Sequence, residues 1–362
     1  MNIKLCSPAK GETISLLPPT HKALLDGRLI TGTVPSLDWT ALKQAGSEHS
    51  FPLPVEFIWT VTDVQNPTAH SMQLWLSTEP DFSHSRIIPL PVDAQKAEVF
   101  NFKAGTQYFW KIVRNAENGC CSSNTGSFFT RDETPTLYRA DGLTNIRDTG
   151  GWRTANGDRI RRGMVFRGSE MDTHHTITDQ GRQSLRDELG IHTDLDLRGE
   201  AVGKIHCSPL GDDIRFELLP VKAYAEFMAE DQAAACRAVF ALFADANAYP
   251  VYLHCWGGAD RTGTVVLLLN ALLGAGDEDL LLDYEMTSFS IWGERSRNSE
   301  QFQSLLTALA QYGSPADPLR IKAENYLLTA GVTKTQVATI RALLLESETT
   351  EEIYHDRQTE MV

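Results

Sequence analysis

One stretch decides the fold of the second half of the chain, and it reads Pro250-Val251-Tyr252-Leu253-His254-Cys255-Trp256-Gly257-Gly258-Ala259-Asp260-Arg261-Thr262-Gly263. The apolar run at 250–254 predicts a buried strand, and residues 262–273, apolar nearly all round, predict a buried helix. Further strand and helix patterns alternate on both sides, with a strand expected at 191–197 and helices at 231–247, 280–284, 299–310 and 335–345. This alternation predicts an α/β domain whose central sheet is flanked by helices.

The loop between this strand and this helix has the composition of an anion site. A strand end, a tight loop and a helix start aim backbone N–H groups inward, and the helix dipole adds to their attraction for phosphate. Gly257 and Gly258 let the backbone approach a ligand closely, and the fork of Arg261 can hold two phosphate oxygens. Cys255 lies in the same positive field, which favours the thiolate, its nucleophilic form. The expected phosphate-binding residues are Trp256, Gly257, Gly258, Ala259, Asp260 and Arg261.

The string His-Cys-x-x-Gly-x-Asp-Arg-Thr-Gly resembles the signature of cysteine-dependent tyrosine phosphatases, and more narrowly that of bacterial tyrosine and dual-specificity phosphatases. The resemblance extends to four other segments, which are residues 145–151, 162–170, 189–198 and 283–285. It implies a catalytic domain over residues 139–346.

The resemblance also implies roles for the residues of the loop. Cys255 would be the nucleophile that forms a phosphocysteine, and Arg261 would bind the phosphate and its developing charge. Thr262 would ease the departure of the thiolate, and His254 would orient the loop and tune the thiol. No cofactor and no metal are expected, because no cluster of metal-ligating residues accompanies the loop.

The general acid is the least determined of these roles. An aryl phosphate leaves more easily when its phenolic oxygen is protonated, so a carboxylic acid is expected within reach. The segment after Pro220, where relatives can carry an acid, reads Val-Lys-Ala-Tyr. Asp260 in the loop is therefore the first candidate, with Asp196 and Asp148 as alternatives that more naturally tie down arginines or backbone amides.

Arginines gather in an otherwise acidic domain, at positions 147, 153, 159, 161, 162 and 167. They form either a solvated face or an anion site, in which Arg147 or Arg167 backs the phosphate loop or meets an acidic flank of the substrate. The resembling segments add Asp196 and Arg198 to this supporting set. His174 and His175 are adjacent and lack a partner set for a metal, so they are expected in a surface loop.

Two departures from the family pattern bear on the substrate. The relatives' lysine before Asp-Arg is Ala259 here, and their small residue after the cysteine is Trp256. The lost positive charge weakens the case for polyanionic lipid headgroups. The expected function is a protein tyrosine phosphatase, with possible dual specificity, acting on a phosphotyrosine protein or peptide. The alternatives are a phosphatase of small phosphorylated molecules or phosphoinositides and, more remotely, a non-catalytic phosphate-binding module.

The first 131 residues have a different pattern. Aromatic and branched residues alternate with period two around Trp59, Leu74 and Trp110, and turn residues separate these runs, which predicts an all-β sandwich. The pieces SPAKG, FIWT, STEPDFS and AGTQYFWKI resemble fibronectin type III-like modules. We expect this sandwich at 1–131, a linker at 132–138 and a polar tail at 347–362, with no binding partner identified for the β domain.

Composition excludes several classes of protein. The net charge is -14 and resides entirely in residues 132–362, which argues against nucleic acid as a partner. No apolar run approaches the length that spans a bilayer. The six cysteines show no zinc spacing and are expected to be reduced thiols. The N-terminal residues contain no apolar signal segment, which favours the cytoplasm and leaves secretion open.

Overall fold

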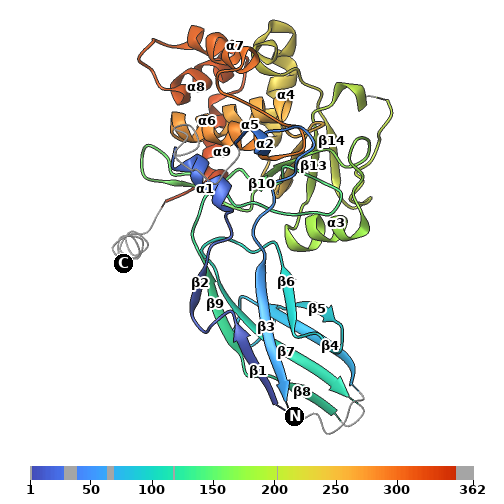
Figure 1. Ribbon diagram of the computed structural model, residues 1–362. Coiled ribbons are helices and arrows are strands. Elements are labelled where there is room, and N and C mark those ends of the chain that lie inside the picture. The colour runs from blue at the N-terminus through green and yellow to red at the C-terminus, as the bar shows by residue number, and fades with distance from the viewer. Residues whose placement is uncertain (1, 28–38, 63–68, 117–118, 202, 348–362) are drawn as a thin grey trace. The chain divides into compact units, whose positions relative to one another are not determined.

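The computed structural model of the protein describes residues 2–27, 39–62, 69–116, 119–201 and 203–347 (Figure 1). The chain forms two compact units, one of Met1–Pro18 with Pro52–Thr136 and one of Pro19–Phe51 with Leu137–Val362. The predicted polar tail at 347–362 lies, apart from its first residue, outside the described residues.

The first unit is an all-β sandwich, as the sequence predicted. One sheet has the order β1-β3-β6 and the other the order β2-β9-β7-β4-β5, with β8 beside β7 (Figure 1). The strands are β1 (Asn2–Ser7), β2 (Glu12–Ile14), β3 (Val55–Thr62), β4 (Ala69–Ser77), β5 (Arg86–Leu90), β6 (Lys96–Val99), β7 (Gln107–Ala116), β8 (Gly119–Ser122) and β9 (Gly126–Thr130).

The core of this unit lies between the two sheets. Phe57 of β3 packs edge-on against Trp110 of β7, with ring centroids 4.9 Å apart, and both rings are completely buried. Leu74 of β4 and Phe128 of β9 belong to the same cluster. The period-two alternation therefore arises because every second residue of these strands faces the opposite sheet.

The second unit is an α/β domain with a five-stranded sheet of order β10-β12-β15-β13-β14. The strands are β10 (Arg147–Asp148), β12 (Val165–Gly168), β13 (Thr193–Asp196), β14 (Arg215–Leu218) and β15 (Val251–His254). All pairs are parallel except β10 with β12. A separate two-stranded ribbon joins β11 (Arg159–Ile160) to β16 (Leu345–Glu346).

Two hydrophobic cores cover the two faces of this sheet. Val251 and Leu253 of β15 belong to the larger core, which is shared with the helices from residue 233 onward, whereas Tyr252 belongs to the smaller one. Alternate residues of the central strand thus enter opposite cores, so β15 is buried on both faces and reads as a continuous apolar run.

The helices of this unit are α1 (Pro19–Leu25), α2 (Trp39–Leu42), α3 (Asp179–Gln183), α4 (Ala233–Phe243), α5 (Asp260–Leu273), α6 (Asp277–Met286), α7 (Glu300–Leu309), α8 (Leu319–Thr329) and α9 (Lys334–Leu344). Short helical turns add η1 (Ser184–Glu188), η2 (Gly199–Ala201), η3 (Tyr224–Met228), η4 (Glu230–Gln232), η5 (Ala246–Ala248), η6 (Thr287–Phe289) and η7 (Ala310–Tyr312). The sequence analysis missed α1, α2, α3 and α8. The apolar residues of α8 form no clear stripe. In the described part of the chain, no helix is long and apolar enough to cross a membrane.

One segment lies in a different unit from the one the sequence suggested. Residues 19–51, here named the N-terminal arm, belong to the second unit, although 1–131 were expected to form a single sandwich. The physical reason is burial, because Ala23 and Leu24 of α1 enter the larger core of the α/β domain, and the ring of His21 lies 4.2 Å from that of Phe289. The chain therefore passes between the units at three points, before residues 19, 52 and 137.

Candidate active site

The predicted phosphate loop connects β15 to α5 and contains Cys255, which is only 3% exposed. Ala259 is the N-cap residue of α5, and Asp260 and Arg261 begin its first turn. Within the described residues, no backbone N–H group of the segment 256–261 donates to a protein acceptor. Free N–H groups at a helix start carry partial positive charge, so this loop is suited to an anion.

The carbonyl groups of the loop are bound from behind. The side-chain amide of Asn145 donates to the carbonyl oxygens of Gly257, at 2.9 Å, and Gly258, at 3.3 Å. Arg167 also donates to the Gly258 oxygen, at 2.6 Å. Because the C=O and N–H of one peptide group point in opposite directions, these contacts turn the N–H groups of the following residues towards the inside of the loop.

Gly258 has φ = +63°, and a Cβ atom there would lie 2.1 Å from the carbonyl oxygen of Gly168. Only glycine fits this position, which explains the second glycine of the motif.

A buried carboxylate holds the arginines behind the loop. Asp283 accepts a hydrogen bond from Nε of Arg147 at 2.8 Å and another from Nη1 of Arg167 at 2.5 Å. Burial lowers the pKa of Arg167 to about 10, which leaves it charged at neutral pH. Asp283 thus fixes Arg147 and Arg167 behind the loop, whereas Arg161 binds the carbonyl oxygen of Leu345.

His254 lies directly behind Cys255 and is paired with Asp194. Its Nε2 atom is 2.8 Å from Oδ1 of Asp194, and its Nδ1 atom is 3.2 Å from the carbonyl oxygen of Cys255. Burial opposes a charged imidazole, but the charge of Asp194 and its hydrogen bond outweigh burial and raise the pKa of His254 to about 9. The cationic ring adds positive potential next to the cysteine.

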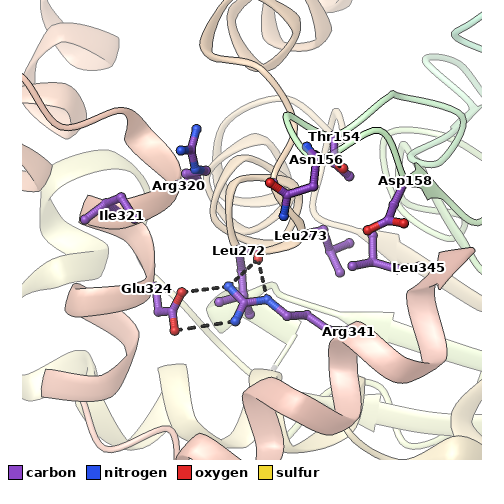
Figure 2. Close-up of a pocket in the computed structure, with 11 residues that line it drawn as sticks. Thr154, Asn156, Asp158, Leu272, Leu273, Arg320, Ile321, Glu324, Arg341 and Leu345 are labelled. Atoms are coloured by element: carbon purple, nitrogen blue, oxygen red, sulfur yellow. Dashed lines mark hydrogen bonds and ion pairs between the residues drawn. The ribbon is translucent and has the colours of Figure 1, made fainter. Parts of the chain in front are cut away.

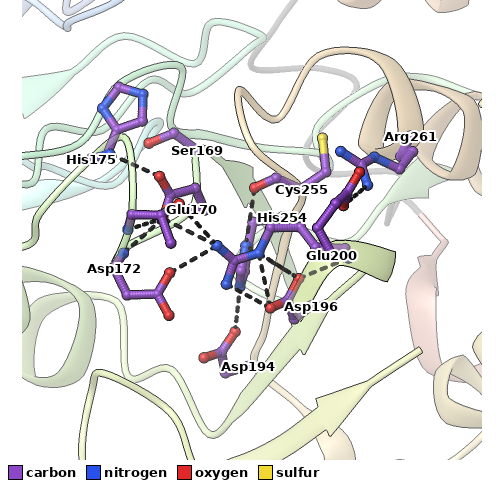
Figure 3. Close-up of polar contacts among 12 residues, drawn as sticks. Ser169, Glu170, Asp172, His175, Asp194, Asp196, Glu200, His254, Cys255 and Arg261 are labelled. Atoms are coloured by element: carbon purple, nitrogen blue, oxygen red, sulfur yellow. Dashed lines mark hydrogen bonds and ion pairs between the residues drawn. The ribbon is translucent and has the colours of Figure 1, made fainter. Parts of the chain in front are cut away.

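Figure 3 shows the thiol of Cys255 pointing towards the guanidinium group of Arg261. Nη1 of Arg261 donates to Glu200 at 2.8 Å, and Glu200 is largely exposed. This hydrogen bond lowers the pKa of Glu200. Thr262 is fully buried, and its hydroxyl has no partner among the described residues, so it is available to a group bound in the loop.

The carboxylate of Asp260 has two partners that the sequence analysis did not identify. Arg295 donates to both its oxygens, at 2.9 Å from Nε and 3.2 Å from Nη2. The hydroxyl of Tyr224 also donates to Asp260, and it lies 2.8 Å from the hydroxyl of Tyr284. Burial, then the charge of Asp260, raise the pKa of Tyr224 well above its usual value. Tyr224 has φ = +57°, a strained backbone for an aromatic residue.

The other two acid candidates are bound in the protein interior. Asp196 is fully buried and accepts from Arg198, with the shortest contact at 2.7 Å. Nη1 of Arg198 reaches Asp172 at 2.8 Å and Glu170 at 3.3 Å. Asp148 accepts from the backbone N–H groups of residues 150 and 163, at 2.8 and 2.6 Å. Burial raises the pKa of Asp148 to about 6. Both carboxylates thus bind arginine or backbone amides.

The expectation of a surface loop was wrong for His175. It is buried, and its Nε2 atom accepts a hydrogen bond from Nε1 of Trp292 at 3.1 Å. The exposed ring of His174 packs edge-on against Trp256, with centroids 4.7 Å apart. A Cβ atom on Gly257 would lie 2.8 Å from the Trp292 ring. An aromatic wall of His174, Trp256 and Trp292 therefore borders the phosphate loop.

No group of three His, Cys, Asp or Glu side chains in the described ranges could hold a metal ion. A hollow of about 380 Å³ lies at the other end of α5, around Leu272 and Leu273 (Figure 2). There Arg341 binds Glu324 at 2.6 Å and the carbonyl oxygen of Leu272 at 3.0 Å. This hollow contains no cysteine, and the fourteen-residue helix places it ~20 Å from the loop.

Sequence reasoning missed Asp194, Glu200, Tyr224 and Arg295. Asp194 and Glu200 flank the Asp196–Arg198 segment, and Tyr224 lies in the segment that was searched only for an acid. Tyrosine was a usable signal there, because its hydroxyl can orient a carboxyl group. Arg295 comes from the loop between α6 and α7, which no motif marks.

Known proteins match the α/β domain. The model of the tyrosine phosphatase family matches residues 138–346, more than half of the chain. A Cupriavidus necator protein named as a tyrosine-protein phosphatase is 26% identical over 214 residues, covering 52% of this chain and 74% of its own. The triple specificity protein phosphatase PtpB of Mycobacterium tuberculosis is 28% identical over 211 residues, covering 45% of this chain and 73% of its own.

Among solved structures, the core catalytic domain of the PP-IP phosphatase SIW14 from S. cerevisiae, in complex with citrate, matches with a TM-score of 0.29 and 12% identity. It covers 40% of this chain and 78% of its own. The family match spans the phosphate loop and the strands and helices that position it. The chain therefore belongs to the tyrosine phosphatase family.

Proposed function

We propose that the protein hydrolyses phosphotyrosine, and to a lesser extent other phosphomonoesters, through a phosphocysteine intermediate on Cys255. The observation that carries this proposal is the loop itself. Its carbonyl groups are bound from behind by Asn145 and Arg167, its N–H groups have no protein acceptor within the described residues, and Arg261 faces the thiol. Such a preorganised set of donors stabilises charge that develops on a transferred phosphoryl group.

The reaction has two steps. In the first, the Cys255 thiolate attacks phosphorus, an S–P bond forms, and the P–O bond to the aryl group breaks as Asp260 gives its proton to the leaving oxygen. In the second, Asp260 takes a proton from water, the water oxygen attacks phosphorus, and the S–P bond breaks to release the thiolate. Arg261 holds the phosphoryl oxygens in both steps, and the Thr262 hydroxyl donates to the thiolate as it leaves.

Arg295 and Tyr224 keep the carboxyl oxygens of Asp260 in place for this role. Arg295 donates to both oxygens, and the hydroxyl of Tyr224 donates to one of them.

The aromatic wall supports an aryl substrate. Trp256 lies between His174 and Arg261, whose guanidinium carbon is 5.7 Å from the Trp256 ring centroid. A phenyl ring attached to a phosphate held by Arg261 would meet this aromatic surface, and offset or edge contacts between rings are favourable. Ala259, in the place of a lysine, leaves fewer cations for a polyanionic inositol phosphate.

A second candidate is a broader specificity that includes serine or lipid phosphates. The name of the Mycobacterium tuberculosis relative describes triple specificity. An assay of this protein must therefore include serine and lipid phosphates. A non-catalytic phosphate-binding module is the third candidate, which the intact set of Cys255, Asp260 and Arg261 disfavours.

One panel assay tests the proposal. Phosphotyrosine peptide, phosphoserine peptide and inositol phosphates are offered to the wild-type protein and to Cys255→Ser. We expect the fastest turnover of phosphotyrosine and a loss of at least a hundredfold in Cys255→Ser, which keeps the N–H groups and still binds phosphate. Retention of more than about a hundredth of the rate would contradict the cysteine mechanism.

For the β-sandwich unit, we infer kinship with fibronectin type III-like modules, which have the same two-sheet architecture. The unit contains none of the residues of the proposed reaction. We assign it no chemical step, and its ligand is a separate question from the hydrolysis.

A further inference from the structure

The N-terminal arm lies outside the segment that matches the phosphatase family, yet it contacts the residues that support the phosphate loop. Ser50 is 4% exposed, and its hydroxyl accepts a hydrogen bond from the backbone N–H of Asn145 at 3.0 Å. The same hydroxyl donates to Glu48 at 2.7 Å. The other oxygen of Glu48 accepts from the hydroxyl of Thr144. The arm is therefore bonded to both residues of the Thr144–Asn145 pair.

Asn145 transmits this contact to the loop directly. Its side-chain amide donates to the carbonyl oxygens of Gly257 and Gly258. It has φ = +62°, which is uncommon for a residue other than glycine. The bond from its N–H to Ser50 is one of the contacts that fix this conformation.

The arm also lies along the loop between α6 and α7. The N–H of Gly46 donates to the carbonyl oxygen of Ile291 at 2.6 Å, and the N–H of His49 donates to that of Phe289 at 2.7 Å. Lys43 forms an ion pair with Glu294. This loop carries Trp292, which packs against Gly257, and Arg295, which binds Asp260.

We propose that the N-terminal arm positions the phosphate loop, with Ser50 as its principal positioning residue. The proposal is based on the contacts of the arm with the Thr144–Asn145 pair and with the loop between α6 and α7. Ser50 acts through Asn145, which holds the carbonyl groups of Gly257 and Gly258 so that the following N–H groups face the bound anion. The inference rests on the proposed function only in taking the loop as a phosphate site, and it concerns anion binding before it concerns turnover.

Removal of the Ser50 hydroxyl leaves the buried N–H of Asn145 without an acceptor, which is a costly state. The backbone of Asn145 then relaxes, and its amide no longer holds both carbonyls. We expect Ser50→Ala to weaken the binding of inorganic phosphate roughly tenfold, the scale of one lost buried hydrogen bond. Ser50→Thr keeps the hydroxyl and should restore most of the affinity.

The experiment uses the full-length chain. Isothermal titration with inorganic phosphate compares wild type, Ser50→Ala, Ser50→Thr and Ser47→Ala, well below the melting temperature of each. Ser47 is a matched control, because it lies in the same arm and its hydroxyl has no hydrogen bond within the described residues. The kcat and KM for a small aryl phosphate are measured in parallel.

Weaker phosphate binding and a higher KM in Ser50→Ala alone, reversed in Ser50→Thr, support the inference. A lower melting temperature with unchanged phosphate affinity would make Ser50 merely structural and overturn it. If wild type binds phosphate in this Ser50-dependent manner but hydrolyses no phosphoester, the inference stands and the proposed function fails. If phosphate binding is equal in all four proteins, the inference fails whatever the turnover.

Discussion

The imidazole of His254 and the carboxylate of Asp194 form a buried pair, with Nε2 and Oδ1 2.8 Å apart. Asp194 comes from β13 and His254 from the neighbouring strand β15. A second oxygen of Asp194 accepts from Ser208 at 2.7 Å. The carboxylate is thus held on both sides, and it keeps a positive charge one residue before the candidate nucleophile.

This pair predicts a specific dependence of stability on pH. The pKa of His254 is about 9 in the folded protein, above the usual ~6.5 of an unfolded histidine. Its stabilising contribution is therefore complete below pH ~6.5 and is lost as the pH rises towards 9, by on the order of 3 kcal/mol.

Asp194→Asn removes the charge that raises the pKa of His254, so the loss of stability between pH 6 and pH 9.5 should become much smaller. The measurement is the free energy of unfolding of the α/β unit from urea titrations at both pH values. Asp212→Asn, at an exposed position, is the control and should behave as wild type. An identical pH dependence in Asp194→Asn would show that His254 is not charged through this pair.

Asp260→Asn tests the general acid. An acid matters when the leaving group is poor, so the variant should slow phosphotyrosine cleavage roughly 10²–10⁴-fold. A nitro-substituted aryl phosphate should be slowed much less, because its phenolate leaves unaided. The basic limb of the pH–rate profile should flatten for phosphotyrosine. Equal slowing of both substrates would assign Asp260 to holding Arg295 and Tyr224 in place.

Glu200→Gln tests competition for Arg261. Glu200 accepts from Nη1 of Arg261 at 2.8 Å, on the guanidinium group that must face the phosphate. Loss of this negative charge should tighten the binding of inorganic phosphate by about two- to fivefold, in line with the small energy of an exposed ion pair. Glu226→Gln, at an exposed position, is the control. Weaker binding would mean that Glu200 orients Arg261 rather than competing for it.

A truncated chain that begins at Leu137 should lose stability. It lacks the arm, and the buried side chain of Leu24 alone contributes about 1.5–3 kcal/mol. The sequence analysis expected the catalytic domain at residues 139–346, which leaves the arm out. We now expect a lower melting temperature and weaker phosphate binding, measured by calorimetry against the full chain. If the truncated chain has the melting temperature and phosphate affinity of the full chain, the arm is not essential.

The sequence predicted the two architectures because both arise from local periodicity. The alternation around Trp59, Leu74 and Trp110 identified half-buried strands, and the apolar run before His254 identified a strand buried on both faces. It did not predict that the arm joins the second unit. Only two core hydrophobics of α1, Ala23 and Leu24, carry that information, and the core they enter is built from residues more than a hundred positions later.

The sequence likewise predicted only part of the candidate site. The loop from Cys255 to Arg261 is contiguous, so its residues were predicted together. The partners of Asp260 come from η3 and from the loop after α6, and a sequence pattern does not encode such distant pairings. Asp194 illustrates a closer failure, since it lies two residues before the predicted Asp196. The strand register pairs His254 with Asp196, yet Nε2 of His254 contacts Asp194, so the direction of the side chains and not the register selects this partner.

The three crossings of the chain between units have a consequence for protease treatment. A single cut after Thr136 would leave a first fragment that still carries α1 and the rest of the arm, and a second fragment whose surface binds Leu24 and the Gly46–His49 backbone. The fragments would then remain associated through these contacts and elute together from a size-exclusion column under native conditions. Replacement of residues 1–136 by another β module would also remove the arm, which belongs to the phosphatase unit. The two units are therefore expected to be inherited together.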